Sequence, residues 1–262
     1  MTDTHLFASP AAELKAMNTH RSFEAVVNLV REKHSRLDLV LVTGDVAQDG
    51  SVAAYRQFAE LIATLDVPWH WIPGNHDNPG SMQIAVPCTT ANDRVIRLGN
   101  WLFLLLDTAV EAQEYGLLAP KEIGFLKREL RVANTDTTVA HCLVALHHNP
   151  VDTSAKWMQD IGLHHRYSLW QQLRHTDKLR CLIYGHVHQA QECIHDGIHC
   201  LSAPSTCFQF KPDVTKFTLD RLNPGYRHLQ LYQDGSVKTK VYRIADRHFG
   251  AEYKTSDRST GE

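Results

Sequence analysis

The sequence lacks the features that mark several protein classes. Its six cysteines form no CxxC pair, so we expect buried thiols in a reducing compartment rather than a thiol metal site. No apolar run approaches the ~20 residues that a membrane helix needs, and no signal-peptide pattern precedes Asp3. Basic side chains number 27 against 29 acidic ones, for a net charge of -2. This balance disfavours nucleic acid and membranes as partners, and we expect a cytoplasmic protein.

The chain is long enough, at 262 residues, to bury one large core, and we expect a single domain over residues 1–262. Short apolar strands alternate with amphipathic helices in its first part, as they do in parallel βαβ units. The expected strands lie at residues 37–42, 67–72, 101–106, 142–146 and 179–184. The expected helices lie at residues 22–35, after Ser51, after Pro120 and at residues 168–175, whereas residues 81–98 give too weak a pattern to assign.

The last part of the chain changes character, because short strands between turn signals replace the helices. These strands are expected at residues 192–201, 217–219, 226–232 and 237–244. They should form a second, mainly antiparallel sheet packed on the first. The polar tail from Asp246 to Glu262 is expected to be flexible. The expected fold is therefore an α/β (α+β) sandwich of two sheets.

Side chains that bind metals recur where the strands end. Asp45 follows the first buried strand, and the segments Gly74-Asn75-His76-Asp77, His147-His148 and Gly185-His186-Val187-His188 follow later ones. Asp3 and His5 lie two residues apart near the start, and on extended chain such a pair faces one way, as His186 and His188 should. Open α/β sheets bind ligands beyond the carboxyl ends of their strands. Taken singly, each segment is also explained as a polar turn, a surface histidine or a polar terminus.

One or two ligands per strand end give a set of seven: Asp3, His5, Asp45, Asn75, His147, His186 and His188. Seven ligands are more than one structural zinc takes, and none is a thiolate. Two ions that share Asp45 would use all seven. Such a pair, ~3.5–4 Å apart, can hold the attacking and leaving oxygens of a phosphoryl displacement.

The order DxH, GDxxxD, GNHD, HH and GHxH resembles the calcineurin-like metallophosphoesterases over nearly the whole chain. Residues 2–8, 43–49 and 203–212 are most similar to the bacterial class III cyclic-AMP phosphodiesterases of this family. The resemblance implies a four-layer αββα fold and hydrolysis of 3′,5′-cyclic AMP to 5′-AMP by a metal-bridging hydroxide. It implies two divalent metal ions, Fe²⁺ or Mn²⁺ first, with Zn²⁺ or Co²⁺ also compatible with the ligands.

The resemblance also assigns a role to each site residue. The first metal would be held by Asp3, His5, Asp45 and His188, and the second by Asp45, Asn75, His147 and His186. His76 would be a catalytic residue beside the scissile phosphate that protonates the departing 3′-oxygen, and Asp45 the other. Contacts with the nucleotide substrate would come from His5, Asp45, Asn75, His76 and His188.

Several nearby residues keep two interpretations. Asp77 could orient His76 or form a structural salt bridge. Asp49 could cap a helix or support a metal ligand rather than bind a metal itself, and Asp107 is more typical of a helix-capping residue than of a metal ligand. His148 is left over as a supporting or surface imidazole. Residues 205–210 could line a nucleotide pocket, or they could be the segment after a core strand, with buried aromatic side chains.

Two other functions stay open on the same residues. The site could act on another phosphodiester or nucleotide, or the chain could be a non-catalytic scaffold, as in a retromer subunit that resembles these enzymes. The intact ligand set argues against the scaffold. The oligomeric state is not set by the sequence.

One departure from the family concerns the start of the chain. Relatives carry an apolar strand before the Asp3-Thr4-His5 segment, whereas only Met1 and Thr2 precede it here. A typical strand has ~5–6 residues, so the first strand looks truncated, and we expect the natural chain to start upstream. Asp3 and His5 would then lie on a frayed end unless neighbouring strands order them.

Overall fold

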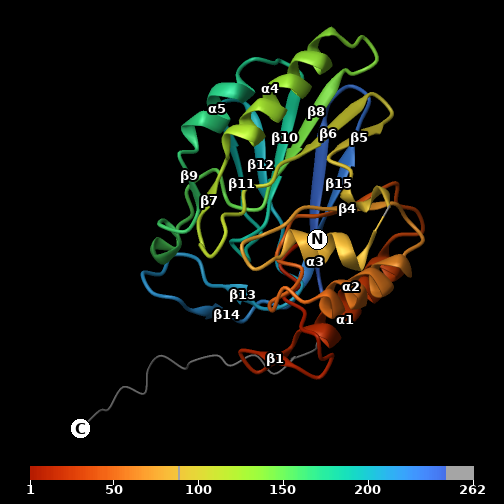
Figure 1. Ribbon diagram of the computed structural model, residues 1–262, viewed down its shortest axis with the longest axis vertical. Coiled ribbons are helices and arrows are strands. Elements are labelled where there is room, and N and C mark those ends of the chain that lie inside the picture. Colours follow the sequence, from red (N-terminus) through yellow and green to blue (C-terminus); the bar gives the residue numbers. More distant parts are fainter. Residues whose placement is uncertain (88, 246–262) are drawn as a thin grey trace.

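The computed structural model describes residues 1–87 and 89–245, which stack as helices, sheet, sheet and helices (Figure 1). The largest layer is a six-stranded mixed sheet. Its strands are, in spatial order, β11 (Glu192–His195), β12 (Ile198–Ser202), β10 (Leu179–Tyr184), β8 (His141–Ala145), β6 (Trp101–Leu105) and β5 (Val95–Leu98). The four inner strands are parallel, and the two edge strands pair antiparallel with them.

The second sheet layer is built from two strand pairs. β3 (Val40–Val42) pairs parallel with β4 (Trp69–Trp71), and β15 (Gly225–Leu231) pairs antiparallel with β16 (Val237–Arg243). Their apolar side chains pack on those of the six-stranded sheet and form the central core. A cavity of about 530 Å³ lies between the β3 segment and β15.

Amphipathic helices cover the two outer faces. The helices α4 (Pro120–Thr135) and α5 (Tyr167–Leu173) pack on the six-stranded sheet, and α1 (Thr19–Lys33) and α2 (Val52–Ala63) pack on β3 and β4. Phe23 of α1 stacks on Phe58 of α2 at 4.9 Å between ring centroids. The expected two-sheet α/β sandwich with helices outside is confirmed.

The helix termini follow the local sequence with one exception. Ser51 caps α2, since its hydroxyl accepts from the Ala54 N–H at 3.2 Å, and Pro120 begins α4 as expected. The first helix was expected from Ser22, but it begins at Thr19 because Asn18 is the capping residue. Ser22 is instead buried and donates to a backbone carbonyl.

Residues 81–98, whose pattern is too weak to assign, hold most of α3 (Pro79–Ala85), the 3₁₀ turn η1 (Thr90–Asn92) and β5. One expectation about the strands is wrong. The late strands were expected to form the second sheet alone, yet β11 and β12 extend the first sheet because β12 pairs parallel with β10. The local sequence pattern can show that a segment is a strand, but it does not identify the partner strand.

The remaining elements are short and surround the site end of the sheets. They are β1 (Glu13–Leu14), β2 (Met17–Asn18), β7 (Gly116–Leu117), η2 (Lys156–Met158), β9 (Leu163–His164), β13 (Gln209–Phe210) and β14 (Leu219–Asp220). No helix in the described ranges combines the length and apolar character that crossing a membrane requires.

Four of the five described cysteines are buried as expected, whereas Cys193 on the edge strand β11 is exposed, which corrects the expectation for that residue. Cys88 and the tail from Asp246 to Glu262 lie outside the described residues.

Candidate metal centre

The segment Met1–Leu6 lies beside the chain that leaves β3. The Met1 ammonium group donates to the Leu41 carbonyl at 2.8 Å, and the Asp3 and His5 N–H groups donate to the Gly44 and Asp45 carbonyls at 3.0 Å each. Asp3 and His5 are both buried. The segment after β3 therefore orders the two residues. Leu6 alone in this segment forms a β-bridge, which pairs it with Ala47.

The structure brings all seven predicted ligands together. They project from the first segment and from the loops that follow β3, β4, β8 and β10, and all are buried except Asn75, which is half-buried. Six of the seven, all but Asn75, occur in triads of side chains whose ligand atoms lie within 4.8 Å of one another, and three of these triads also contain Cys207, His148 or His76. The residues lie close together because the carboxyl ends of these strands meet at one edge.

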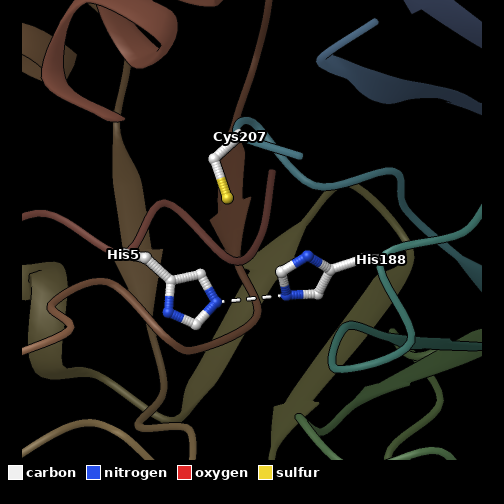
Figure 2. A group of neighbouring side chains, drawn as sticks. All are labelled: His5, His188 and Cys207. Carbon is white, nitrogen blue, oxygen red and sulfur yellow. Dashed lines mark hydrogen bonds between the residues drawn. The ribbon is translucent and has the colours of Figure 1, made fainter. Parts of the chain in front are cut away.

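One half of the cluster contains Asp3, His5 and His188. The His5 and His188 Nε2 atoms are 3.1 Å apart (Figure 2), and an Asp3 carboxylate oxygen lies 3.4 Å from the His188 Nε2. The Nδ1 atoms of both rings face backbone or side-chain oxygens, at 2.9 Å for His188 and Phe208 and at 2.8 Å for His5 and Gln48. Protons on Nδ1 leave two Nε2 lone pairs facing each other, an arrangement that a cation between them would satisfy.

The other half contains Asn75, His147 and His186. The Asn75 side-chain oxygen lies 3.1 Å from the His147 Nε2 and 3.1 Å from the His186 Nδ1. The His147 Nδ1 donates to the Thr43 carbonyl at 2.7 Å, and the His186 Nε2 is buried without a hydrogen-bond partner. The Asn75 oxygen thus joins the two imidazoles of this half.

Asp45 lies between the two halves. One of its carboxylate oxygens is 3.3 Å from the His147 Nε2 and 3.8 Å from the His5 Nε2. Its other oxygen accepts from the His76 N–H at 2.9 Å. A single carboxylate thus contacts both groups of imidazoles, and the clusters suit a pair of metal ions.

The backbone of the cluster is not extended. The φ angles of Asp3, His5, Asp45, His186 and His188 lie between 45° and 67°, in the left-handed region. The expectation that Asp3 and His5, and likewise His186 and His188, lie on extended chain is therefore wrong. Asp and His tolerate this region better than most residues, and functional sites are where such strain is held.

Two glycines allow the loops that carry the site residues to pack directly on one another. A Cβ at Gly74 would overlap the Asp45 carboxylate, and a Cβ at Gly44 would lie 2.5 Å from the His147 Nδ1. Gly44 also has a φ of +93°, which a side chain would strain. The glycine of each loop is thus required where it packs on a ligand from another loop.

The charges of the cluster are those of a metal-binding group. Burial lowers the pKa of His5 to about 3, and burial with the neighbouring His147 lowers that of His186 to about 3. Burial disfavours the charged form of His147 as well, but the Asp45 carboxylate outweighs it and raises the pKa to about 9. The same pairing holds the pKa of Asp45 well below its usual range. In the metal-free cluster the His147 ring thus carries a second proton, which a bound cation would displace.

Two histidines lie beside the predicted ligands. His76 is exposed, with its ring 5.0 Å from the His5 ring. His148 is fully buried, its Nδ1 lies 2.8 Å from the Thr108 hydroxyl, and its Nε2 has no hydrogen-bond partner. Its ring lies 4.7 Å from that of His186, so the leftover histidine borders the second half rather than the surface.

The three acidic residues with two interpretations take supporting positions. Asp49 accepts from the Ala8 N–H at 2.8 Å and the Ser51 N–H at 3.0 Å, and Asp107 accepts from the Ala109 N–H at 2.9 Å. Asp77 forms neither expected contact, since its oxygens accept from three backbone N–H groups and the Tyr55 hydroxyl. All three therefore brace loops.

The segment 205–210 serves the core more than a pocket. Ser205 donates to the Asp3 carbonyl at 2.8 Å, and Phe208 is 5% exposed with its ring stacked on His188. Burial raises the pKa of the Cys207 thiol beside His5 and His188 (Figure 2), so it stays protonated. Sequence reasoning missed Gln48, whose side chain lies between His5 and His76, because a glutamine in a loop carries no metal-binding signal.

Comparison with known proteins gives matches over nearly the full chain. Residues 1–190 match the family model for calcineurin-like phosphoesterases. A 3′,5′-cyclic adenosine monophosphate phosphodiesterase CpdA of Pseudomonas aeruginosa is 39% identical over 98% of this chain and 93% of its own. The CpdA of Escherichia coli K12 is 38% identical over 95% of this chain and 90% of its own.

Solved structures resemble the fold at lower identity. A dimetal phosphatase from Danio rerio has a TM-score of 0.63 at 15% identity, over 96% of this chain and 98% of its own. A purple acid phosphatase from yellow lupin has a TM-score of 0.61 at 16% identity, over 92% of this chain and 50% of its own. These likenesses support the four-layer architecture.

Proposed function

The chain belongs to the calcineurin-like phosphoesterase family, and we propose that it hydrolyses 3′,5′-cyclic AMP to 5′-AMP at a two-metal centre. The convergence of seven metal-binding side chains in one cluster supports this activity most directly. Relatives that are 38–39% identical over nearly their whole length are named as cyclic-AMP phosphodiesterases. We take residues 1–262 as one catalytic domain.

The ligand roles follow from the two halves of the cluster. Asp3, His5 and His188 would hold the first ion, and Asn75, His147 and His186 the second. Asp45 would contact both, because its carboxylate lies between the imidazoles of the two halves. Mixed nitrogen and oxygen ligands favour Fe²⁺ or Mn²⁺, and they also accept Zn²⁺ or Co²⁺.

Two divalent cations bound there would neutralise the phosphodiester anion and acidify a water molecule for attack on phosphorus. The chain's own contribution is to hold the imidazoles in the correct tautomer. The Thr43 and Phe208 carbonyls accept from the Nδ1 atoms of His147 and His188, so each Nε2 is directed at the cluster.

His76 would supply the proton that the departing 3′-oxygen needs. It is the exposed histidine at the edge of the buried cluster, and its backbone N–H is fixed by Asp45. An imidazole there is open to a bound nucleotide and is the kind of side chain that most often serves as a general acid. A small nucleotide rather than nucleic acid is the proposed substrate, since the chain has no excess of basic residues.

The test is metal-dependent turnover of cyclic AMP by the purified full chain. Metal-depleted protein is reloaded with each of the four metals in turn, and 5′-AMP formation is compared with hydrolysis of bis(nitrophenyl) phosphate. Hydrolysis of both is expected. Two bound ions with hydrolysis of the nitrophenyl diester alone would refute cyclic AMP as the substrate, while the family assignment would stand.

The variant Asp45→Asn tests the shared ligand. An amide lacks the charge to bridge two cations, so both ions should be lost and activity with them. Asp107→Asn is the matched control, because Asp107 also follows a strand but braces a turn outside the cluster. Metal analysis that found two tightly held ions in Asp45→Asn would disprove the bridging role.

A further inference from the structure

The side-chain amide of Gln48 lies between two histidines with different proposed tasks. Its oxygen is 2.8 Å from the His5 Nδ1, and its nitrogen is 3.1 Å from the His76 Nδ1. The Gln48 backbone is itself fixed, since its N–H donates to the Leu6 carbonyl at 2.7 Å. The half-buried amide is thus held in a position from which it contacts both rings.

The orientation of the amide follows from the chemistry of His5. The His5 Nε2 faces the His188 Nε2 at 3.1 Å and Asp45 at 3.8 Å, so Nε2 is the atom directed at the cluster. A neutral imidazole with its lone pair on Nε2 carries its proton on Nδ1, and that proton requires an acceptor. The Gln48 oxygen is that acceptor, and its NH₂ group must therefore point to His76.

The same amide then dictates the state of His76. An NH₂ group can only donate, so the His76 Nδ1 must accept and the ring proton must reside on Nε2. We propose that Gln48 is a positioning residue that sets both tautomers at once, keeping the His5 Nε2 free for a cation and the His76 Nε2–H as a hydrogen-bond donor. The metal-binding part of this inference rests on the proposed function, whereas the tautomers can be measured without it.

Two substitutions at Gln48 separate its effect on His5 from its effect on His76. In Gln48→Glu, a carboxylate still accepts from His5 but also accepts at His76, so the His76 proton should move to Nδ1. In Gln48→Met, a side chain of similar length offers neither contact, so His5 is free to donate from Nε2 to His188. Gln57→Met is the matched control, because the Gln57 amide holds the Phe7 and Ala8 carbonyls outside the cluster.

The direct measurement is two-bond ¹H–¹⁵N NMR of histidine-labelled, metal-free full chain. His5→Ala and His76→Ala spectra identify the two rings by their missing signals. We expect His5 with Nδ1–H and His76 with Nε2–H in the wild type, a switch of His76 alone in Gln48→Glu, and mixed His5 tautomers in Gln48→Met. Wild-type His76 with Nδ1–H, or no change in either variant, would overturn the inference.

The loaded protein gives a second, independent comparison. Gln48→Met should weaken the first ion roughly 10- to 100-fold, the usual effect of losing a group that orients a ligand. Gln48→Glu should bind both ions as tightly as the wild type, because its carboxylate still accepts from the His5 Nδ1. Weakened binding of the first ion in Gln48→Glu to the level of Gln48→Met would show that the acceptor at His5 is not what Gln48 contributes. An inactive wild type would refute the proposed function while leaving the NMR result valid.

Discussion

Asp77 is the residue whose loss should damage the centre most without removing a ligand. One carboxylate oxygen accepts from the Ala47 N–H at 2.9 Å and the Tyr55 hydroxyl at 3.0 Å. The other accepts from the Gly74 N–H at 2.9 Å and the Val46 N–H at 3.1 Å. Asp77 therefore joins the loop that carries Asp45 to the loop that carries Asn75.

The substitution Asp77→Ala would leave three backbone N–H groups of buried residues without an acceptor. Each unsatisfied group costs about 1–3 kcal/mol, so the expected loss is at least about 3 kcal/mol, the lower limit applying if water enters the vacated space. Asp77→Asn should cost a similar amount, because its NH₂ group would face two donors. Against a typical total of about 5–15 kcal/mol, either loss is large.

Urea unfolding of the metal-free protein measures this loss, and metal titration of the folded variants measures its effect on the centre. Both ions should bind more weakly, since Asp45 and Asn75 would no longer be held together. Asp38→Ala is the control, because Asp38 is exposed and its removal should change stability by less than about 0.5 kcal/mol. A loss below about 1 kcal/mol in Asp77→Ala, or unchanged affinity for both ions, would show that Asp77 does not brace the loops.

The pKa of about 9 for His147 predicts opposite responses to pH in the metal-free and loaded proteins. Folded protein holds a proton on His147 that unfolded protein releases. The resulting stabilisation of the metal-free protein is complete below about pH 6.5 and is lost as pH rises through about 9. Metal affinity should instead rise over this interval, because the competing proton leaves His147. Urea unfolding and metal titration across that interval test it, and parallel trends would refute it. Phe208→Ala should lower stability by about 3–5 kcal/mol and leave the ratio of KM values for cyclic AMP and a small diester unchanged, because Phe208 is buried. A selective rise in KM for cyclic AMP would instead place it in the substrate pocket.

Five of the seven proposed ligands could be predicted from the sequence because they follow apolar runs that end abruptly. Asp45, His147 and His186 stand directly beyond β3, β8 and β10, and the parallel order of such strands brings their ends to one edge. Asp3 was harder to place, since its order comes from hydrogen bonds to Gly44 rather than from its own segment. The local pattern of a short segment does not contain that information.

The groups that orient the ligands could not be predicted, because their roles depend on distant partners. Gln48 and Asp77 are ordinary loop residues until the fold brings the His5 and Asn75 segments beside them. The sheet assignment failed for the same reason. β12 lies among short strands between turn signals, and its parallel partner β10 is apparent only in three dimensions.

The two carboxylates of the centre are oriented by backbone groups from other loops. The His76 N–H donates to Asp45, and the His186 N–H lies 3.1 Å from an Asp3 oxygen. Left-handed backbone at Asp3, Asp45 and His186 directs these groups inward, so each loop fixes the ligand of another. Replacing one ligand side chain leaves these backbone contacts in place, whereas a side chain at Gly74 would force two loops apart. The geometry of the centre is therefore more sensitive to residues between the ligands than to any single ligand.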